Sequence, residues 1–559
     1  MKKIYGLTLL TFIFCTSNAF ADASFIDIAP MVIRGEDLPP HLLGKPIAHL
    51  SLMSVQQGQL KPMPYQIDAL DESGLIYIPG LSKKPPAGPV NKLDLSDEIV
   101  FMLRDAGEQL SVASSEKILQ EIKIQTPEPC YVYLVENNNQ RSSINYLRTS
   151  LKKGTLQTPA LFLKFNPKNL ADIQQAALRQ GDGYSKNLLA KLELSASAGI
   201  LSSLFTTHLS LKDNIEAKPI GVKEGPVRST FLLRTTIKWI GIPFYHSDFS
   251  INFYPYSIKM PSRFASDSLG TLSRFIFLLK NPQAKFNIYL TNLNQGHFHF
   301  DSLQNPTAYC AANGRMGPVE QQVNAHRLPG DWIYFQNPSL QALYSNRLPL
   351  TENGVFDAFL KGAQFRLTYN NIAPNQARFS VELEGLPKLA LKLLPSLSKL
   401  QLGSEGHLQK FIDVLLAEQN QRRRHELDEV IKAAFAQLRK DQGIRSPTAL
   451  ARLLIADVNK IGISGIDRQT FNQLIHETFA RMNKLDDFSI KNQLGDFARL
   501  AQQRGIDLTQ VSYRAIDNTV WFPPKPISPS QLSEVDNLLA LTPAISFNTT
   551  QIALHTTNE

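Results

Sequence analysis

Short runs rich in Ile, Val, Phe, Tyr and Thr, separated by Pro, Gly and Asn, fill the chain from Asp22 to about Pro395. Runs of this kind predict β-strands, and many strands with few helices favour antiparallel sandwiches over a parallel sheet. In 231–239 the odd-numbered side chains are mostly apolar, which is typical of a half-buried strand. The clearest strand candidates are 98–104, 131–136, 229–239, 248–255, 286–290, 332–335 and 364–369.

Two stretches in this region differ from their surroundings. Residues 170–192 have a helix-like composition and predict one long helical interruption, centred on 172–178. Residues 83–89, with the sequence KKPPAGP, predict an exposed loop because proline and glycine favour turns.

Near residue 400 the apolar residues change to helical spacing. Ser446 and Pro447 have the form of an N-cap followed by proline at the first helical position. Asp467 precedes another helical stripe, which consists of Phe471, Leu474, Ile475, Phe479 and Met482. These stripes predict a bundle of four or so helices. A strand-like segment at 511–522 follows, and its return to the β part would make the bundle an insertion.

We therefore expect a multidomain α+β fold. It would consist of a large antiparallel β-sandwich region that is followed, or interrupted, by a small helical bundle.

The N-terminus carries the features of a secretory signal peptide. Lys2 and Lys3 precede an apolar stretch at 4–15, and Ala19-Phe20-Ala21 has the form of a cleavage site. The apolar stretch is too short to cross a bilayer, which takes ~20 helical residues. We expect cleavage after Ala21, a periplasmic location, no transmembrane span in the mature chain and no nucleic-acid partner.

The net charge of +9 is spread along the chain. In the envelope it predicts contact with anionic glycans or lipid head groups, with simple solubility as the alternative. The two cysteines left after processing, Cys130 and Cys310, are a candidate disulfide in an oxidising compartment, and two separate buried thiols are the alternative.

One local pattern has the residue types of a catalytic or metal site. His297, His299 and Asp301 alternate with Phe298 and Phe300, so on a strand they would share one face. Imidazoles at this spacing can bind a metal or move protons, with the carboxylate as a third ligand or an orienting group. The alternative is the polar face of an ordinary half-buried strand.

Two further sets of residues are candidate binding groups. Asp94, Asp97 and Glu98 could supply the clustered oxygen ligands that Ca²⁺ prefers, or they could simply form a turn ahead of a strand. The aromatic residues that could stack on sugar rings, or else belong to the core, are Trp239, Tyr254, Tyr256 and Trp332. No nucleophile-elbow, zincin, Walker A or dinucleotide motif occurs, and the sequence names no cofactor.

Two fragments carry a resemblance to a known group. They are Pro64-Tyr65-Gln66-Ile67-Asp68, followed by the acidic stretch from Leu93 to Gly107, and Glu224-Gly225-Pro226-Val227-Arg228. They resemble uncharacterised exported bacterial β-sandwich proteins of the galactose-mutarotase-like supersandwich type. The resemblance implies a large sandwich and a glycan-type ligand, and it assigns no functional residue.

The expected segments are a signal peptide at 1–21, an N-terminal β domain at 22–150, a supersandwich-like domain at 151–398, a helical bundle at 399–510, and a strand with an extended tail at 511–559. The first functional hypothesis is a binding or accessory protein of the cell envelope with a glycan or protein partner. The second is a carbohydrate-active enzyme that uses His297, His299 and Asp301. The third is a structural scaffold of an envelope assembly or secretion system. The oligomeric state is left open.

Overall fold

The structure, a computed structural model, describes residues 28–265, 279–347 and 364–384, each range with short gaps, and separate segments between 446 and 548. The signal-peptide segment lies outside these residues. Each of the seven strand candidates coincides with a strand, and the candidate at 229–239 matches its strand end to end. Runs of β-branched and aromatic residues between turn-forming residues were sufficient to find these strands.

Two sheets enclose the first core and form what we call the N-terminal unit. The smaller sheet has the strand order β1 (Pro30–Arg34), β5 (Glu98–Met102), β4 (Tyr65–Asp68). Fully buried apolar side chains from both sheets, such as Ile33, Phe101, Ile122 and Leu134, fill the space between them. The larger sheet has the order β28 (Ile545–Asn548), β6 (Lys117–Ile124), β7 (Cys130–Glu136), β2 (Leu50–Gln56), β3 (Gln59–Pro62).

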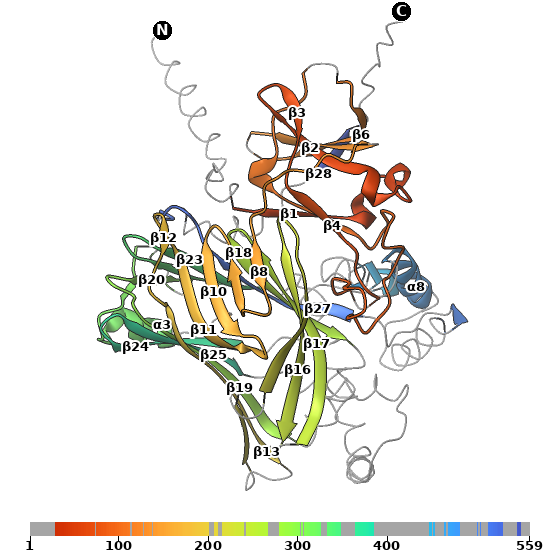
Figure 1. Ribbon diagram of the computed structural model, residues 1–559. Helices are drawn as coiled ribbons and strands as arrows, with labels where there is room; N and C mark the ends of the chain where they lie inside the picture. The colour runs from red at the N-terminus through yellow and green to blue at the C-terminus, as the bar shows by residue number, and fades with distance from the viewer. Residues whose placement is uncertain are drawn as a thin grey trace, which may run out of the picture.

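Three further sheets form the main β region, which lies below the N-terminal unit in Figure 1. One has the order β12 (Gly183–Tyr184), β11 (Asn169–Gln180), β10 (Leu161–Asn166), β9 (Thr155–Gln157), β8 (Arg148–Ser150). Another has the order β14 (Thr206–Ser210), β13 (Leu189–Ile200), β19 (Leu279–Leu290), β25 (Gln376–Glu384), β24 (Gln364–Ala373).

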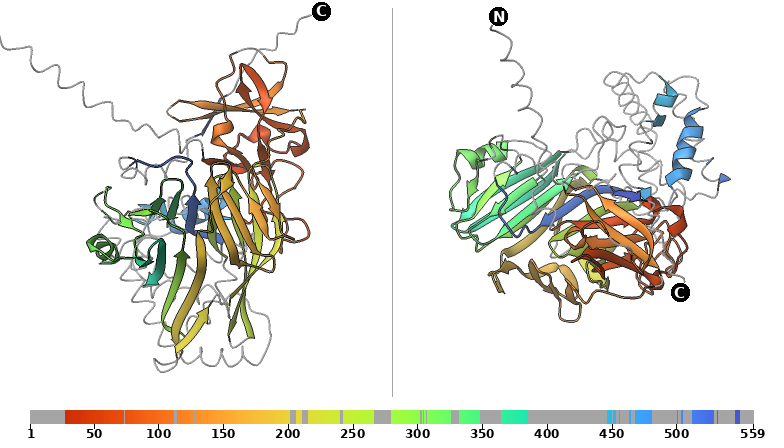
Figure 2. Two further views of the ribbon diagram at one scale, coloured as in Figure 1. Left: turned by 60° about the vertical axis from the view of Figure 1, so that its left-hand side comes forward. Right: turned by 90° about the horizontal axis from the view of Figure 1, so that it is seen from above.

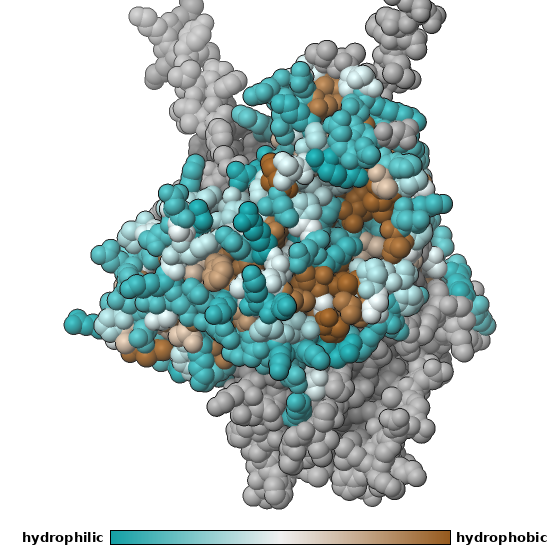
Figure 3. Space-filling view, in the orientation of Figure 1, coloured by the Kyte–Doolittle hydropathy of each residue, from teal (hydrophilic) through white to brown (hydrophobic). Residues whose placement is uncertain are grey.

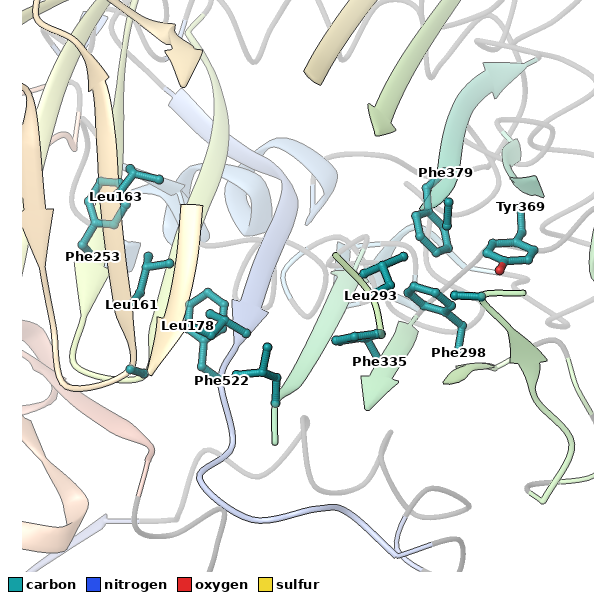
Figure 4. Close-up of a cluster of buried hydrophobic side chains, with 14 of the residues drawn as sticks. Leu161, Leu163, Leu178, Phe253, Leu293, Phe298, Phe335, Tyr369, Phe379 and Phe522 are labelled. Carbon is teal, nitrogen blue, oxygen red and sulfur yellow. The ribbon is translucent and has the colours of Figure 1, made fainter. Parts of the chain in front are cut away.

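The third sheet of this region is ten-stranded. Its order is β15 (Ile215–Lys223), β16 (Ser229–Trp239), β17 (Ile242–Tyr254), β18 (Ser257–Ala265), β27 (Ser512–Trp521), β23 (Gln341–Arg347), β22 (Trp332–Gln336), β20 (His297–Phe300), β21 (Cys310–Ala311), with β26 (Ile463–Ser464) beside β27. All three sheets contribute to one large core, and Figure 4 shows part of it, including Leu163, Phe253, Phe298 and Phe379.

Strand β27 returns the chain to the β region, as the sequence at 511–522 suggested. It pairs with β18 on one side and with β23 on the other, although more than 160 residues separate it from either strand. The chain between Glu384 and Ser512 therefore connects two strands of the β region, and β26 within it pairs with β27. Figure 2 shows α8 (Arg468–Ala480), in light blue, to one side of the sheets.

The expected α+β fold with a helical bundle is wrong. In the residues that the structure describes, the chain is built from strands in five sheets. The α-helices with defined ends in these residues are α3 (Pro318–Ala325) and α8. Helix α8 does bury the predicted stripe residues Phe471, Leu474 and Ile475. The Ser446 cap is also present, since the Ala449 N–H donates to Ser446 Oγ at 3.2 Å. Most of 399–510 lies outside the described residues.

The expected helix at 170–192 is wrong as well. Residues 169–180 form β11, which pairs antiparallel with β10, and the strand β13 begins at Leu189. Leu170 and Leu178 are buried in the main core, and Ala177 is fully buried. The burial gained in the sheet thus overrides the helix propensity of the Ala, Gln and Leu residues in this stretch.

Candidate functional site

Strand β20 places the two predicted imidazoles on one face of the ten-stranded sheet. Phe298 and Phe300, which are 1% and 2% exposed, point into the main core. Figure 4 shows Phe298 beside Phe335, Tyr369 and Phe379. His297 and His299 consequently lie on the opposite face, because successive side chains of a strand alternate. Asp301 follows the strand, and its backbone N–H donates to the Trp332 carbonyl at 3.3 Å.

A tyrosine from another segment joins these imidazoles. Tyr309 directly precedes β21, which pairs with β20 in the register Phe298↔Cys310, so Tyr309 lies on the His297 face. Its ring stacks on His297 with a centroid distance of 4.1 Å and an interplanar angle of 27°. The Tyr309 side chain is 44% exposed, whereas His299 beneath it is only 5% exposed.

Strand β22 supplies the rest of this group. Tyr334 lies opposite His299 in the ladder, with ring centroids 5.9 Å apart, and Gln336 lies opposite His297. The Gln336 Nε2 atom is 3.4 Å from His299 Nε2, which suits an amide donating to an unprotonated ring nitrogen. We call His297, His299, Tyr309, Tyr334 and Gln336 the His–Tyr face.

The surroundings of His297 favour its uncharged imidazole. Burial lowers the pKa of His297 below its ordinary value. A neutral imidazole offers one hydrogen-bond donor and one acceptor, which suits hydroxyl groups of a ligand. Within the described ranges, no group of three or more His, Cys, Asp or Glu side chains is arranged to hold a metal ion.

Backbone strain lies just before β20. Asn292 and Gln295 both adopt left-handed backbone conformations, with φ of 57° and 54°. Such conformations are costly for residues other than glycine, and they gather at ligand-binding sites. The turn that leads into the His–Tyr face thus has a feature common at functional sites.

The predicted sugar-stacking aromatic residues are placed differently. Tyr254 and Trp332 are 3% and 6% exposed and pack within apolar clusters, so neither ring is open to a ligand. Tyr256 is half-buried and accepts a hydrogen bond from Arg104 Nη1 at 2.8 Å. Trp239 ends β16, and its side chain lies outside the described residues.

Two of the predicted calcium ligands, Asp94 and Asp97, lie in a hydrogen-bonded turn. Asp94 Oδ1 accepts hydrogen bonds from the backbone N–H and the hydroxyl of Ser96, and the Asp94 N–H donates to Asp97 Oδ2 at 2.9 Å. Burial raises the pKa of Asp97 to about 7. Glu98, the third candidate, points away to Arg228, whose Nη1 lies 2.6 Å from Glu98 Oε2.

The two fragments that carried the family resemblance meet at this ion pair. Arg228 is buried and also donates to Asp68 Oδ2, while Gln66 Oε1 accepts the Arg228 backbone N–H at 2.8 Å. Lys223 Nζ lies 3.0 Å from Asp68 Oδ1. Burial alone would raise the pKa of Asp68, but Arg228 and Lys223 together hold it below its ordinary value. This cluster fastens the N-terminal unit to the ten-stranded sheet, and the side-chain cations of Arg228 and Lys223 compensate its carboxylates.

The expected disulfide is absent, because Cys130 and Cys310 are both free thiols. Cys130 begins β7 beside the core of the N-terminal unit, whereas Cys310 is buried in the main core. The two residues belong to different sheets and different cores, which keeps them apart.

Sequence reasoning missed Tyr309 and Gln336. Neither belongs to a motif, and both reach the histidines only through strand pairing. The sequence signal was weak, because Tyr309 is a single tyrosine next to a cysteine in a segment without clear alternation.

No protein-family model matches this chain, and no curated protein matches it. Among solved structures, it is similar to an alpha-mannosidase from Enterococcus faecalis V583, with 9% sequence identity and a TM-score of 0.29. The match covers 64% of this chain and 38% of the mannosidase chain, so this protein spans well under two thirds of that structure. At this level of similarity the match assigns neither a family nor an activity.

Proposed function

We propose that this chain is an exported protein of the bacterial cell envelope that binds a carbohydrate-type ligand at the His–Tyr face. The observation that carries the proposal is the Tyr309 ring, which is 44% exposed and is held in place by stacking on His297. An aromatic ring that is both accessible and fixed can stack on the apolar face of a sugar at little entropic cost.

The groups around Tyr309 suit the hydroxyls of the same ligand. His297 is uncharged near neutral pH because burial lowers its pKa, and Gln336 carries both an amide donor and an acceptor.

Export is proposed from residues 1–21, which have the sequence features of a cleaved signal peptide. Among the described residues, no helix is long and apolar enough to span a bilayer.

The test is a thermal-shift screen of the mature chain, residues 22–559, against peptidoglycan fragments and lipopolysaccharide-core oligosaccharides. A ligand at a hundred times its Kd stabilises the native state by ~2.7 kcal/mol, which is enough to move the melting temperature by several degrees. We expect Tyr309→Ala to weaken binding by about tenfold or more, as measured by titration calorimetry.

The control is Tyr184→Ala. Tyr184 is another tyrosine at the surface, but it is half-buried and lies on β12 against Phe162 and Arg179. Equal loss in both variants, or a sugar that binds Tyr309→Ala as tightly as the parent, would contradict the proposed site. Turnover of a bound oligosaccharide that is lost in His297→Ala would favour the enzyme alternative over simple binding.

A further inference from the structure

The loop between β4 and β5 contains a lysine- and proline-rich section, residues 79–95, which we call the Lys–Pro loop. Backbone hydrogen bonds hold it on the protein: the Ala87 N–H donates to Leu70 O at 2.9 Å, and the Ile47 N–H donates to Asn91 O at 3.0 Å. Four prolines further restrict its backbone. The loop is therefore an ordered surface, as the exposed KKPPAGP segment in the sequence suggested.

Large apolar side chains are exposed on this loop. Leu81, Val90 and Leu95 are 40%, 49% and 54% exposed, and they are three of the seven large hydrophobic residues exposed in the described part of the chain. The residues just before the loop pack on the main β region, since Leu75 and Ile78 cluster with Leu232. Figure 3 shows several hydrophobic groups among hydrophilic residues on the face where this loop runs in Figure 1.

The same loop carries a net positive charge. Residues 79–95 have three lysines, Lys83, Lys84 and Lys92, and one acidic residue, Asp94. Lys83 lies 3.5 Å from Asp248, and the same carboxylate lies 2.9 Å from Arg234. Because one carboxylate faces two cations, Lys83, Arg234 and Asp248 together keep a net positive charge. Lys92 is exposed.

We propose that the Lys–Pro loop docks this protein on an anionic lipid surface. Its lysines face the phosphate head groups, and Leu81 and Val90 enter the boundary between head groups and acyl chains. Basic residues combined with exposed apolar side chains are the composition of interfacial membrane contacts. An anionic glycan would contact the lysines but would leave the apolar side chains in water. A lipid surface would contact both the lysines and the apolar side chains, so the loop fits it better.

Docking at this loop is independent of sugar binding at the His–Tyr face. The sugar test measures the binding of soluble ligands to a Tyr309 variant, whereas the lipid test measures binding to vesicles and leaves Tyr309 unchanged. Either proposal can fail while the other stands.

The experiment is co-sedimentation of the mature chain with two kinds of vesicle, pure phosphatidylcholine and an equimolar mixture of phosphatidylcholine with phosphatidylglycerol. We expect binding to the mixed vesicles that weakens with added salt, and much weaker binding to the neutral ones. In Lys83→Gln/Lys92→Gln the affinity for mixed vesicles should fall by about fivefold per lysine. In Leu81→Ser/Val90→Ser it should fall by about fivefold per side chain.

Matched controls change exposed residues elsewhere. Ile144→Ser/Ile372→Ser removes apolar side chains that are 48% and 46% exposed, and Lys152→Gln/Lys153→Gln removes two exposed lysines. Both controls should bind as the parent does, and circular dichroism should show every variant folded. The proposal is overturned if the parent binds neither vesicle, binds both equally, or loses as much affinity in the controls as in the loop variants.

Discussion

At the scale of single residues, Arg228 is the side chain on which the most depends. Its guanidinium is buried between Asp68 and Glu98, and these partners are 160 and 130 positions away in the sequence. Sequence reasoning recognised both fragments but could not pair them, because nothing local encodes contacts over such separations. A buried charge is tolerated only where partners and hydrogen bonds replace the lost water.

We therefore expect Arg228→Met to lower the free energy of unfolding by about 3–5 kcal/mol, because it leaves Asp68 charged and buried without its main partner. Urea unfolding measures the loss. The matched control is Arg234→Met, whose ion pair with Asp248 lies at the surface and should contribute less than about 1 kcal/mol. Similar losses in the two variants would show that the Arg228 ion pairs contribute no more to stability than the Arg234 ion pair does. Part of the loss should be recovered in Arg228→Met/Asp68→Leu.

Asp97 makes stability depend on pH in the direction opposite to that of a typical carboxylate. Burial raises its pKa from 3.8 to about 7, and its Oδ1 atom is buried and accepts no hydrogen bond within the described residues. Between these values the folded state holds a proton that the unfolded state releases. The contribution of Asp97 to stability is therefore lost progressively as the pH rises from about 4 to about 7.

Asp97→Asn removes this ionisation and keeps an oxygen that can accept the Asp94 N–H. We expect the variant to be more stable than the parent by about 2–4 kcal/mol at about pH 8, and the difference should shrink as the pH falls toward about 4. Urea unfolding at several pH values measures the difference. If the difference in unfolding free energy stays constant across this pH range, Asp97 does not have the raised pKa that its burial predicts.

At the scale of elements, the sequence predicted strands where β-branched and aromatic residues form short runs between turn-forming residues. It failed where packing decided against propensity. Residues 169–180 are rich in helix formers, yet β11 pairs with β10 and buries Leu170 and Leu178 in the main core. The same limit applies to the candidate site. The alternation of His297 and His299 with two phenylalanines was readable, but Tyr309 reaches His297 only because β21 pairs with β20.

At the scale of the whole molecule, the C-terminal part of the chain closes structures begun near the N-terminus. Strand β27 completes the ten-stranded sheet, and β28 adds an edge strand to the sheet of the N-terminal unit. In Figure 1 the blue β28 lies beside β6. Ile545 and Phe547 pack against the core of that unit. Their strand pairs with β6, although about 420 residues of sequence separate the two strands. The N-terminal unit is thus assembled from both ends of the described chain.

This topology predicts that the N-terminal unit needs β28 for full stability. A mature chain that ends at residue 544 loses the four pairs between β28 and Glu121–Ile124 and exposes Ile122 and Ile124, which are fully buried at present. Removing two half-buried apolar side chains should cost about 2–3 kcal/mol, so calorimetry should show part of the unfolding several degrees lower. A chain that ends at residue 548 keeps the strand and is the matched control. If both chains melt alike and resist proteolysis near β6 equally, β28 is a dispensable edge, and the N-terminal unit folds from its own strands alone.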